Sequence, residues 1–323
     1  MDITTKALLA LPAFALLALG GLALHAVAPD ASADDPRSLC GGRFYAISTV
    51  AHGASPYIRL TAKGVSGAFL VDYGATASWL SARAFPGSDG SLARDDLSLP
   101  GFTGGHFALW RQDFPLQPPG GQLGIVGTDL LSQFSAQFTR DGVFLGGAPC
   151  RASDLHARGL APVAQKGFFS SVRSGVDPGR PNVPVVYLSL GGARAWAQID
   201  TGYDDLAYPY SVDVNQPFYD LLIKSGIALR RIADIGVATC DGSETRHVYV
   251  APNNPLVIED ERTAPIMRAK TFYLTLKPSN KCGGIATMDV PAAQISASFL
   301  KLFETVVFDP KSETVWLGAG VAR

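Results

Sequence analysis

The sequence predicts an all-β protein in which one structural unit occurs twice. The 323 residues include 34 Gly and 22 Pro, a turn-rich composition that favours many short strands over long helices. Hydrophobic residues make up 47% of the chain, which is enough to form a sizeable core. Two stretches of the chain also follow the same order of residue types, which is the pattern of an internal repeat.

The charge balance excludes some classes of protein. The chain has 27 basic and 28 acidic residues and a net charge of −1. Binding to nucleic-acid phosphates requires a basic patch, and no cluster of Lys and Arg is present, so we expect no nucleic-acid partner. The high apolar content and the low net charge also argue against disorder.

The N-terminus indicates export. Residues 7–28 contain no Asp, Glu, Lys or Arg, follow Lys6 and precede Ala31-Ser32-Ala33, a small-x-small pattern typical of signal-peptidase cleavage. Residues 1–33 are therefore predicted to be a signal peptide, or an uncleaved membrane anchor because the apolar run is long enough to span a bilayer. In either case we expect a periplasmic, secreted or membrane-anchored protein on the oxidising side of a membrane.

The four cysteines agree with an oxidising compartment. They are widely spaced, even in number and contain no C-x-x-C pair, which favours two disulfides over a zinc site. Pairing within each half of the chain would join Cys40 to Cys150 and Cys240 to Cys282. Four cysteines allow three connectivities, so the other two pairings stay open.

The repeat brings an acidic residue to the end of each unit. Residues 57–72 and 185–200 both contain an apolar strand, a Gly-containing turn and a second apolar strand, and both continue as Asp-x-Gly, at Asp72 and at Asp200. A second match is expected between residues 124–129 and 284–289, which would place Thr287 where the first half has Gly127. The interruption over residues 151–182 predicts an N-terminal half of residues 34–155 and a C-terminal half of residues 156–323.

Two aspartates held together can hydrolyse an amide. At about 3 Å the two carboxylates cannot both ionise cheaply, so they share one proton and titrate as a pair. The ionised member can take a proton from a water while the protonated member hydrogen-bonds the carbonyl oxygen under attack. The Gly after x allows the chain to turn back beside the carboxylate. This chemistry needs no metal or cofactor.

The sequence resembles the aspartic peptidases of the pepsin and retroviral-protease superfamily. The resemblance rests on Phe69-Leu70-Val71-Asp72-Tyr73-Gly74-Ala75-Thr76 with Trp79-Leu80-Ser81, on Ile199-Asp200-Thr201-Gly202, on Gly124-Ile125-Val126-Gly127 and on residues 299–318. It implies a two-lobed pepsin-like (acid protease) fold with a pseudo-twofold repeat and a cleft between the lobes. It also implies that Asp72 and Asp200 are the catalytic pair.

The resemblance further implies substrate-binding positions at Gly74, Thr76, Thr201, Gly202, Asp204 and Trp110. Thr201 would bond the two lobes together through its hydroxyl, and position 73 departs from the family because it is Tyr rather than Thr or Ser. The family's cleft-covering hairpin would correspond to residues 99–110, although an ordinary surface hairpin fits them equally well. For Asp204 and Asp205, a solvated or capping role competes with contact to substrate.

The function that follows is an aspartic endopeptidase, a monomer acting on extended polypeptide in the cleft. The alternative is a catalytically inactive relative that binds a peptide or protein partner there. Serine hydrolases, zinc peptidases and phosphate-binding proteins are excluded because the chain has no G-x-S-x-G, H-E-x-x-H or Walker sequence.

Overall fold

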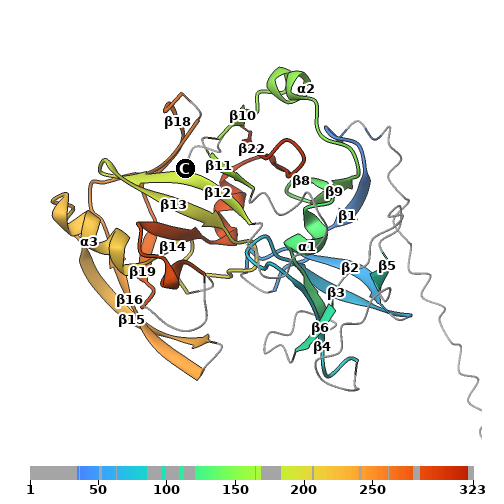
Figure 1. Ribbon diagram of the computed structural model, residues 1–323, viewed down its shortest axis with the longest axis horizontal. Coiled ribbons are helices and arrows are strands. Elements are labelled where there is room, and N and C mark those ends of the chain that lie inside the picture. The colour runs from blue at the N-terminus through green and yellow to red at the C-terminus, as the bar shows by residue number, and fades with distance from the viewer. Residues whose placement is uncertain are drawn as a thin grey trace, which may run out of the picture. The chain divides into compact units, whose positions relative to one another are not determined.

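The computed structural model describes residues 35, 37–50, 53–62, 64–85, 97–98, 109–112, 121–163, 165–168, 183–205, 207–239, 242–260, 262–278 and 284–318. The chain divides into Met1–Asp30 and Ala31–Arg323, and every described residue belongs to the second unit. Nearly half of these residues lie in strands, which form three sheets (Figure 1), so the expectation of a mainly β protein is confirmed.

The first sheet is built from the N-terminal half of the chain. Its order is β5 (Leu97–Ser98), β2 (Tyr57–Ala62), β3 (Val65–Val71), β7 (Gln122–Val126), β4 (Ser78–Ser81) and β6 (Leu109–Gln112). From β2 to β6, neighbouring strands pair in the order antiparallel, parallel, antiparallel, parallel. The turn between β2 and β3 needs a glycine, because Gly64 has a φ of +76°.

The second sheet is larger and contains ten strands from the C-terminal half. Its order is β15 (Arg230–Thr239), β16 (Gly242–Val250), β19 (Tyr273–Leu276), β14 (Ser211–Val214), β20 (Ala292–Ile295), β13 (Ala193–Ile199), β12 (Pro184–Leu190), β17 (Leu256–Glu259) and β18 (Pro265–Ala269), with β11 (Gln165–Phe168) also paired to β12. From β12 through β13, β20, β14 and β19, the pairing is again antiparallel, parallel, antiparallel, parallel. Figure 1 shows β15 and β16 as a long hairpin, drawn in orange.

The third sheet contains strands from both halves. It runs β1 (Arg43–Ala46), β9 (Gly142–Gly146), β8 (Ser135–Phe138), β21 (Val306–Asp309), β22 (Thr314–Leu317) and β10 (Ala161–Pro162). β8 and β21 pair antiparallel, with Phe138 opposite Val306. Residues far apart in the sequence are thus joined by backbone hydrogen bonds in the middle of this sheet.

One predicted disulfide is present. Cys40 and Cys150 are bonded to each other across 110 residues, so this part of the predicted pairing is confirmed. Cys240 and Cys282 lie outside the described residues.

The helices are short. They are α1 (Thr128–Leu131), α2 (Ala152–Ala157), α3 (Gln216–Lys224), and the 3-10 turns η2 (Gly284–Thr287) and η3 (Ala297–Leu302). Asn215 begins α3 by accepting a hydrogen bond from the backbone N–H of Phe218 at 3.1 Å. Within the described part of the chain, no helix is long and apolar enough to cross a membrane. The predicted leader or anchor, residues 1–33, lies outside that part.

The second match expected within the repeat was wrong. Residues 284–287 form the 3-10 turn η2, whereas the strand that runs parallel to β13 is β20. The backbone N–H of Asp72 donates to the carbonyl of Val126, which precedes Gly127, and that of Asp200 donates to the carbonyl of Ile295, which precedes Ser296. Ser296 therefore occupies the position that corresponds to Gly127. Gly, Ile and Asp recur in residues 284–289 at the spacing seen in residues 124–129. Which segment lies beside β13 is decided, however, by strand pairing between residues that are far apart in the sequence.

Candidate active site

Two aspartates lie at the ends of equivalent strands. Asp72 directly follows β3, and its backbone N–H donates to the carbonyl of Val126 at 2.9 Å. Asp200 directly follows β13, and its backbone N–H donates to the carbonyl of Ile295 at 3.0 Å. In both cases the acceptor is on the strand that runs parallel to the strand before the aspartate. The parallel pairing therefore fixes where each acidic residue leaves its sheet.

The loop after each aspartate turns back and donates to the carboxyl group. Asp72 Oδ1 accepts from the amides of Gly74 at 2.7 Å and Ala75 at 3.1 Å. Asp200 Oδ1 accepts from the amides two and three residues later, at 2.8 and 2.9 Å. Two backbone donors favour the ionised form of a carboxyl group. The two loops thus offer the same local environment to their aspartates.

The two carboxyl groups face each other at a point where only glycine fits. A Cβ atom on Gly74 would lie 2.2 Å from Cγ of Asp200, and one on Gly202 would lie 2.4 Å from Oδ2 of Asp72. Real Cβ atoms do not approach other atoms so closely, so any side chain at either glycine would push the carboxyl groups apart. The two carboxyl groups are close enough for each to shift the pKa of the other.

Burial and the closeness of the two carboxyl groups shift their pKa values. Asp200 is only 9% exposed. Burial, and then the neighbouring Asp200 carboxylate, raise the pKa of Asp72 well above its ordinary value. Burial also raises the pKa of Asp200, but the hydrogen bonds from Asp72, from Gln294 and from the loop amides act in the opposite direction. Both carboxyl groups therefore hold a proton more readily than isolated aspartates do, and the donors at Asp200 oppose this effect there.

Sequence comparison does not assign the chain to a family. Neither a protein-family model nor a curated protein matches the chain. Any functional assignment therefore depends on the geometry of the residues themselves.

A threonine hydroxyl bonds one half of the chain to the other beside the pair. Thr201, which is fully buried, donates through Oγ1 to the carbonyl of Val71 at 2.6 Å and accepts from the amide of Tyr73 at 2.9 Å. The hydroxyl thereby connects the loop after β13 with the end of β3. The corresponding position in the first half is Tyr73, which has no short hydroxyl side chain with which to return the bond.

The ring of Tyr73 occupies the core. It is fully buried, stacks on Phe308 with ring centres 4.1 Å apart, and meets Phe138 edge-on at 6.1 Å. The phenol oxygen is buried and has no hydrogen-bond partner among the residues that the structure describes. A tyrosine is thus accommodated at position 73 because aromatic residues from the third sheet surround it.

Sequence reasoning missed Gln294 and Lys277. Gln294 lies in β20 and donates through Nε2 to Oδ2 of Asp200, while its Oε1 accepts from Nζ of Lys277 at 3.4 Å. The signal was a polar side chain inside the otherwise apolar run Ala292–Ile295. It could only be interpreted once β20 was known to lie beside β13.

The other predicted acidic positions have internal partners. Asp204 Oδ1 accepts from the amide of Ala54 at 3.2 Å, and its Oδ2 is buried with no hydrogen-bond partner among the described residues. Asp205 is buried and accepts from the Ser211 amide at 2.9 Å. Its Oδ2 also accepts from two serine hydroxyls, those of Ser296 and Ser298. Asp205 therefore stabilises the loop after Asp200. The alternative that it is a solvated residue is wrong.

The remaining predicted positions are described less fully. Thr76 is half-buried in the loop between Asp72 and β4. Trp110 belongs to β6, where it lies opposite Trp79 in the parallel ladder. Residues 99–108 of the expected cleft-covering hairpin lie outside the described residues. Among the residues that the structure does describe, no group of three or more His, Cys, Asp or Glu could hold a metal ion.

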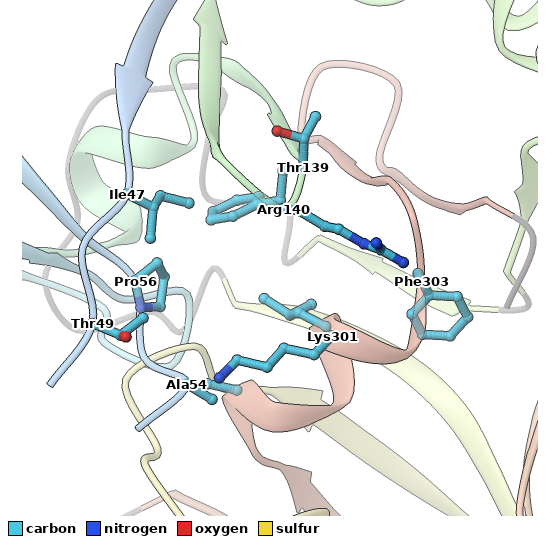
Figure 2. A pocket seen from close by; sticks show the side chains of 11 residues that line it. Ile47, Thr49, Ala54, Pro56, Thr139, Arg140, Lys301 and Phe303 are labelled. Atoms are coloured by element: carbon cyan, nitrogen blue, oxygen red, sulfur yellow. The ribbon is translucent and has the colours of Figure 1, made fainter. Parts of the chain in front are cut away.

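A separate cavity of about 380 Å³ lies between segments of the two halves, and neither aspartate lines it. Its apolar wall comes from Ile47, Pro56 and Phe138 in the first half and from Leu300 and Phe303 in the second. Figure 2 shows Lys301 extending along one side of the cavity toward Ala54, and its ammonium donates to the carbonyl of Gly53 at 2.7 Å. Phe138 lines this cavity and its ring also contacts that of Tyr73.

Proposed function

We propose that the protein is an aspartic endopeptidase that hydrolyses peptide bonds with water activated by Asp72 and Asp200. One observation carries the proposal: the two carboxyl groups face each other across the glycines at 74 and 202, and each is held by amides of its own loop. Paired carboxyl groups that share one proton provide a base and an acid in one place. No other group of described residues combines both roles in this way.

The strand pairing supports a two-lobed, pepsin-like fold with pseudo-twofold symmetry. The order β2-β3-β7-β4-β6 and the order β12-β13-β20-β14-β19 have the same sequence of antiparallel and parallel neighbours, and both place an aspartate after the second strand. We assign residues 34–155 to the N-terminal lobe and residues 156–323 to the C-terminal lobe, with the substrate cleft between them.

The mechanism follows from the two ionisation states. The ionised carboxylate takes a proton from a bound water, whose oxygen forms a bond to the carbonyl carbon of the peptide. The protonated carboxyl group donates a hydrogen bond to the carbonyl oxygen, where negative charge develops. The leaving nitrogen then takes a proton from the pair as the C–N bond breaks, which yields a carboxylic acid and an amine. The loop amides hold the two carboxyl groups in place during these steps.

We propose an extended polypeptide as the substrate and an exported location for the enzyme. An extended chain can hydrogen-bond to strand edges in a cleft without prior folding of its own. The disulfide between Cys40 and Cys150 is compatible with an oxidising compartment.

The test is cleavage of an unfolded protein between about pH 3 and pH 7 by the segment 34–323, with mass spectrometry of the products. Wild type should produce discrete peptides, and Asp72→Asn and Asp200→Asn should each abolish them. Folded wild type without cleavage, and without processing that activates it, would contradict the proposal. A peptide-binding relative that lacks catalysis would then be favoured, because only Thr201 joins the two catalytic loops through its hydroxyl.

A further inference from the structure

Asp200 accepts hydrogen bonds at both of its carboxylate oxygens from different parts of the fold. The amides of its own loop reach Oδ1. Oδ2 receives the side-chain amide of Gln294 on β20, which runs parallel to β13. Gln294 lies opposite Gln198, two residues before Asp200. Its side chain therefore reaches the catalytic loop from the neighbouring strand.

Lys277 determines which end of the Gln294 amide faces Asp200. Its ammonium lies 3.4 Å from Oε1 of Gln294, and an ammonium group can only donate. The carbonyl end of the amide must therefore point to Lys277, and the NH₂ end must point to Asp200. Lys277 itself is fixed to the sheet, because its backbone N–H donates to the carbonyl of Val214 at 2.9 Å. The NH₂ group then meets an acceptor, which favours the ionised form of Asp200.

The first half has no equivalent group beside Asp72. The residue that lies two before Asp72 is Leu70, and its partner on the parallel strand is Ile125. This position corresponds to that of Gln294, so an apolar side chain stands in one half where an amide stands in the other. The sequence thus makes two otherwise similar carboxyl environments unequal.

The other charged groups around Asp200 do not supply the same asymmetry. Asp72 lies across the pair, and the carboxylates of Asp204 and Asp205 follow on the same loop, where both accept backbone amides. Behind the loop, the hydroxyl of Tyr203 donates to Asp213 at 3.2 Å. Asp213 forms a buried ion pair with Arg246, which also pairs with Glu244. Gln294 therefore supplies the neutral side-chain donor that reaches Oδ2 of Asp200 directly, and Lys277 contacts the other end of its amide.

We propose that Gln294, oriented by Lys277, is a positioning residue that keeps Asp200 as the ionised member of the pair and leaves the proton on Asp72. Asp200 is then the base that takes the proton from water, and Asp72 is the acid that hydrogen-bonds the carbonyl oxygen. The inference rests on the proposed peptidase function for these chemical roles. The position of the proton, however, can be measured whether or not the protein cleaves peptides.

The first test is Gln294→Met, which keeps the length of the side chain and removes its donor, beside Gln198→Met as a matched control. For a single peptide substrate, the acidic limb of the kcat/KM profile should move to higher pH in Gln294→Met. On that limb kcat/KM should fall about tenfold, with little change in KM. Lys277→Met should shift the limb in the same direction by less, and Gln198→Met should match wild type. Superimposable profiles for Gln294→Met and Gln198→Met would overturn the inference.

The second test separates this inference from the proposed function. ¹³C NMR of the aspartate carboxyl groups, assigned with the Asp72→Asn and Asp200→Asn variants, follows the titration of both residues in protein that has no activity. Asp200 should ionise at lower pH than Asp72 in wild type, and Gln294→Met should reduce that difference. An unchanged difference in a folded variant would refute the role of Gln294. If Gln294→Met does not fold, Lys277→Met tests the same prediction by the same readout.

Discussion

The buried hydroxyl of Tyr73 leads to an unusual prediction: removing it should not destabilise the protein. Within the described part of the chain the phenol oxygen has no hydrogen-bond partner, while the ring stacks on Phe308. Burying a hydroxyl group without a partner costs roughly 1–3 kcal/mol. Part of this is offset by the small space that the missing oxygen would leave. Tyr73→Phe should therefore raise the free energy of unfolding by about 1 kcal/mol.

Tyr203 is the matched control, because it lies in the corresponding loop after Asp200 and its hydroxyl is paired. Its oxygen lies 2.7 Å from the hydroxyl of Ser211 and donates to Asp213 at 3.2 Å. A hydrogen bond to a charged group contributes about 1.5–3 kcal/mol. Tyr203→Phe should therefore lower the free energy of unfolding by that amount, opposite in sign to the effect of Tyr73→Phe.

Urea unfolding near neutral pH measures both variants. The phenol of Tyr73 stays neutral there, because burial and then the charge of Asp309 raise its pKa well above the ordinary value. Equal slopes of the unfolding transitions would show that the compactness of the end states is unchanged. If Tyr73→Phe loses more than about 1 kcal/mol, or if both variants change stability in the same direction, the unpaired hydroxyl has been misidentified.

Three further predictions concern the bond between the halves, the disulfide and the pair. Thr201→Val leaves the Tyr73 amide and the Val71 carbonyl buried without partners, so it should cost about 2–5 kcal/mol in a urea titration, whereas Thr201→Ser should restore most of the loss. Replacing Cys40 and Cys150 by Ser should lower stability by about 2–5 kcal/mol, because the bond closes a long loop in the unfolded chain. The difference between wild type and variant should vanish when both are unfolded in the presence of a reductant. Asp72→Asn should be more stable than wild type at neutral pH. The folded-state pKa of Asp72 is raised. The stability that Asp72 contributes is therefore fully present below about pH 4, the pKa of an unfolded aspartate, and is lost as the pH rises through the folded-state pKa. The advantage of Asn should vanish on acidification, and an advantage that grew there would refute the sign.

The sequence was sufficient to predict local features of this fold. Two apolar hairpins, each ending in Asp-x-Gly, predicted where Asp72 and Asp200 would lie relative to their strands. Grouping the cysteines by halves predicted the bond between Cys40 and Cys150. These predictions depend on short stretches whose residue types determine their conformation.

Features that depend on non-local pairing were not predictable in the same way. Residues 284–289 were expected to be the counterpart of residues 124–129, but β20, which contains Gln294, lies beside β13 instead. That neighbour is determined only by the folding of the whole C-terminal half. The placement of the Tyr73 ring depends on Phe308, which is far away in the sequence. A single polar residue in an apolar strand shows only that something must pair with it.

The pH dependence of peptide cleavage tests the central claim most directly. We expect a bell-shaped kcat/KM profile for wild type, in which activity needs one proton on the pair and is lost when that proton leaves or when a second one binds. Asp72→Asn and Asp200→Asn, measured beside it, should be inactive across the whole range. A wild-type profile that depends on a single ionisation, or substantial cleavage by either Asn variant, would contradict catalysis by paired aspartates.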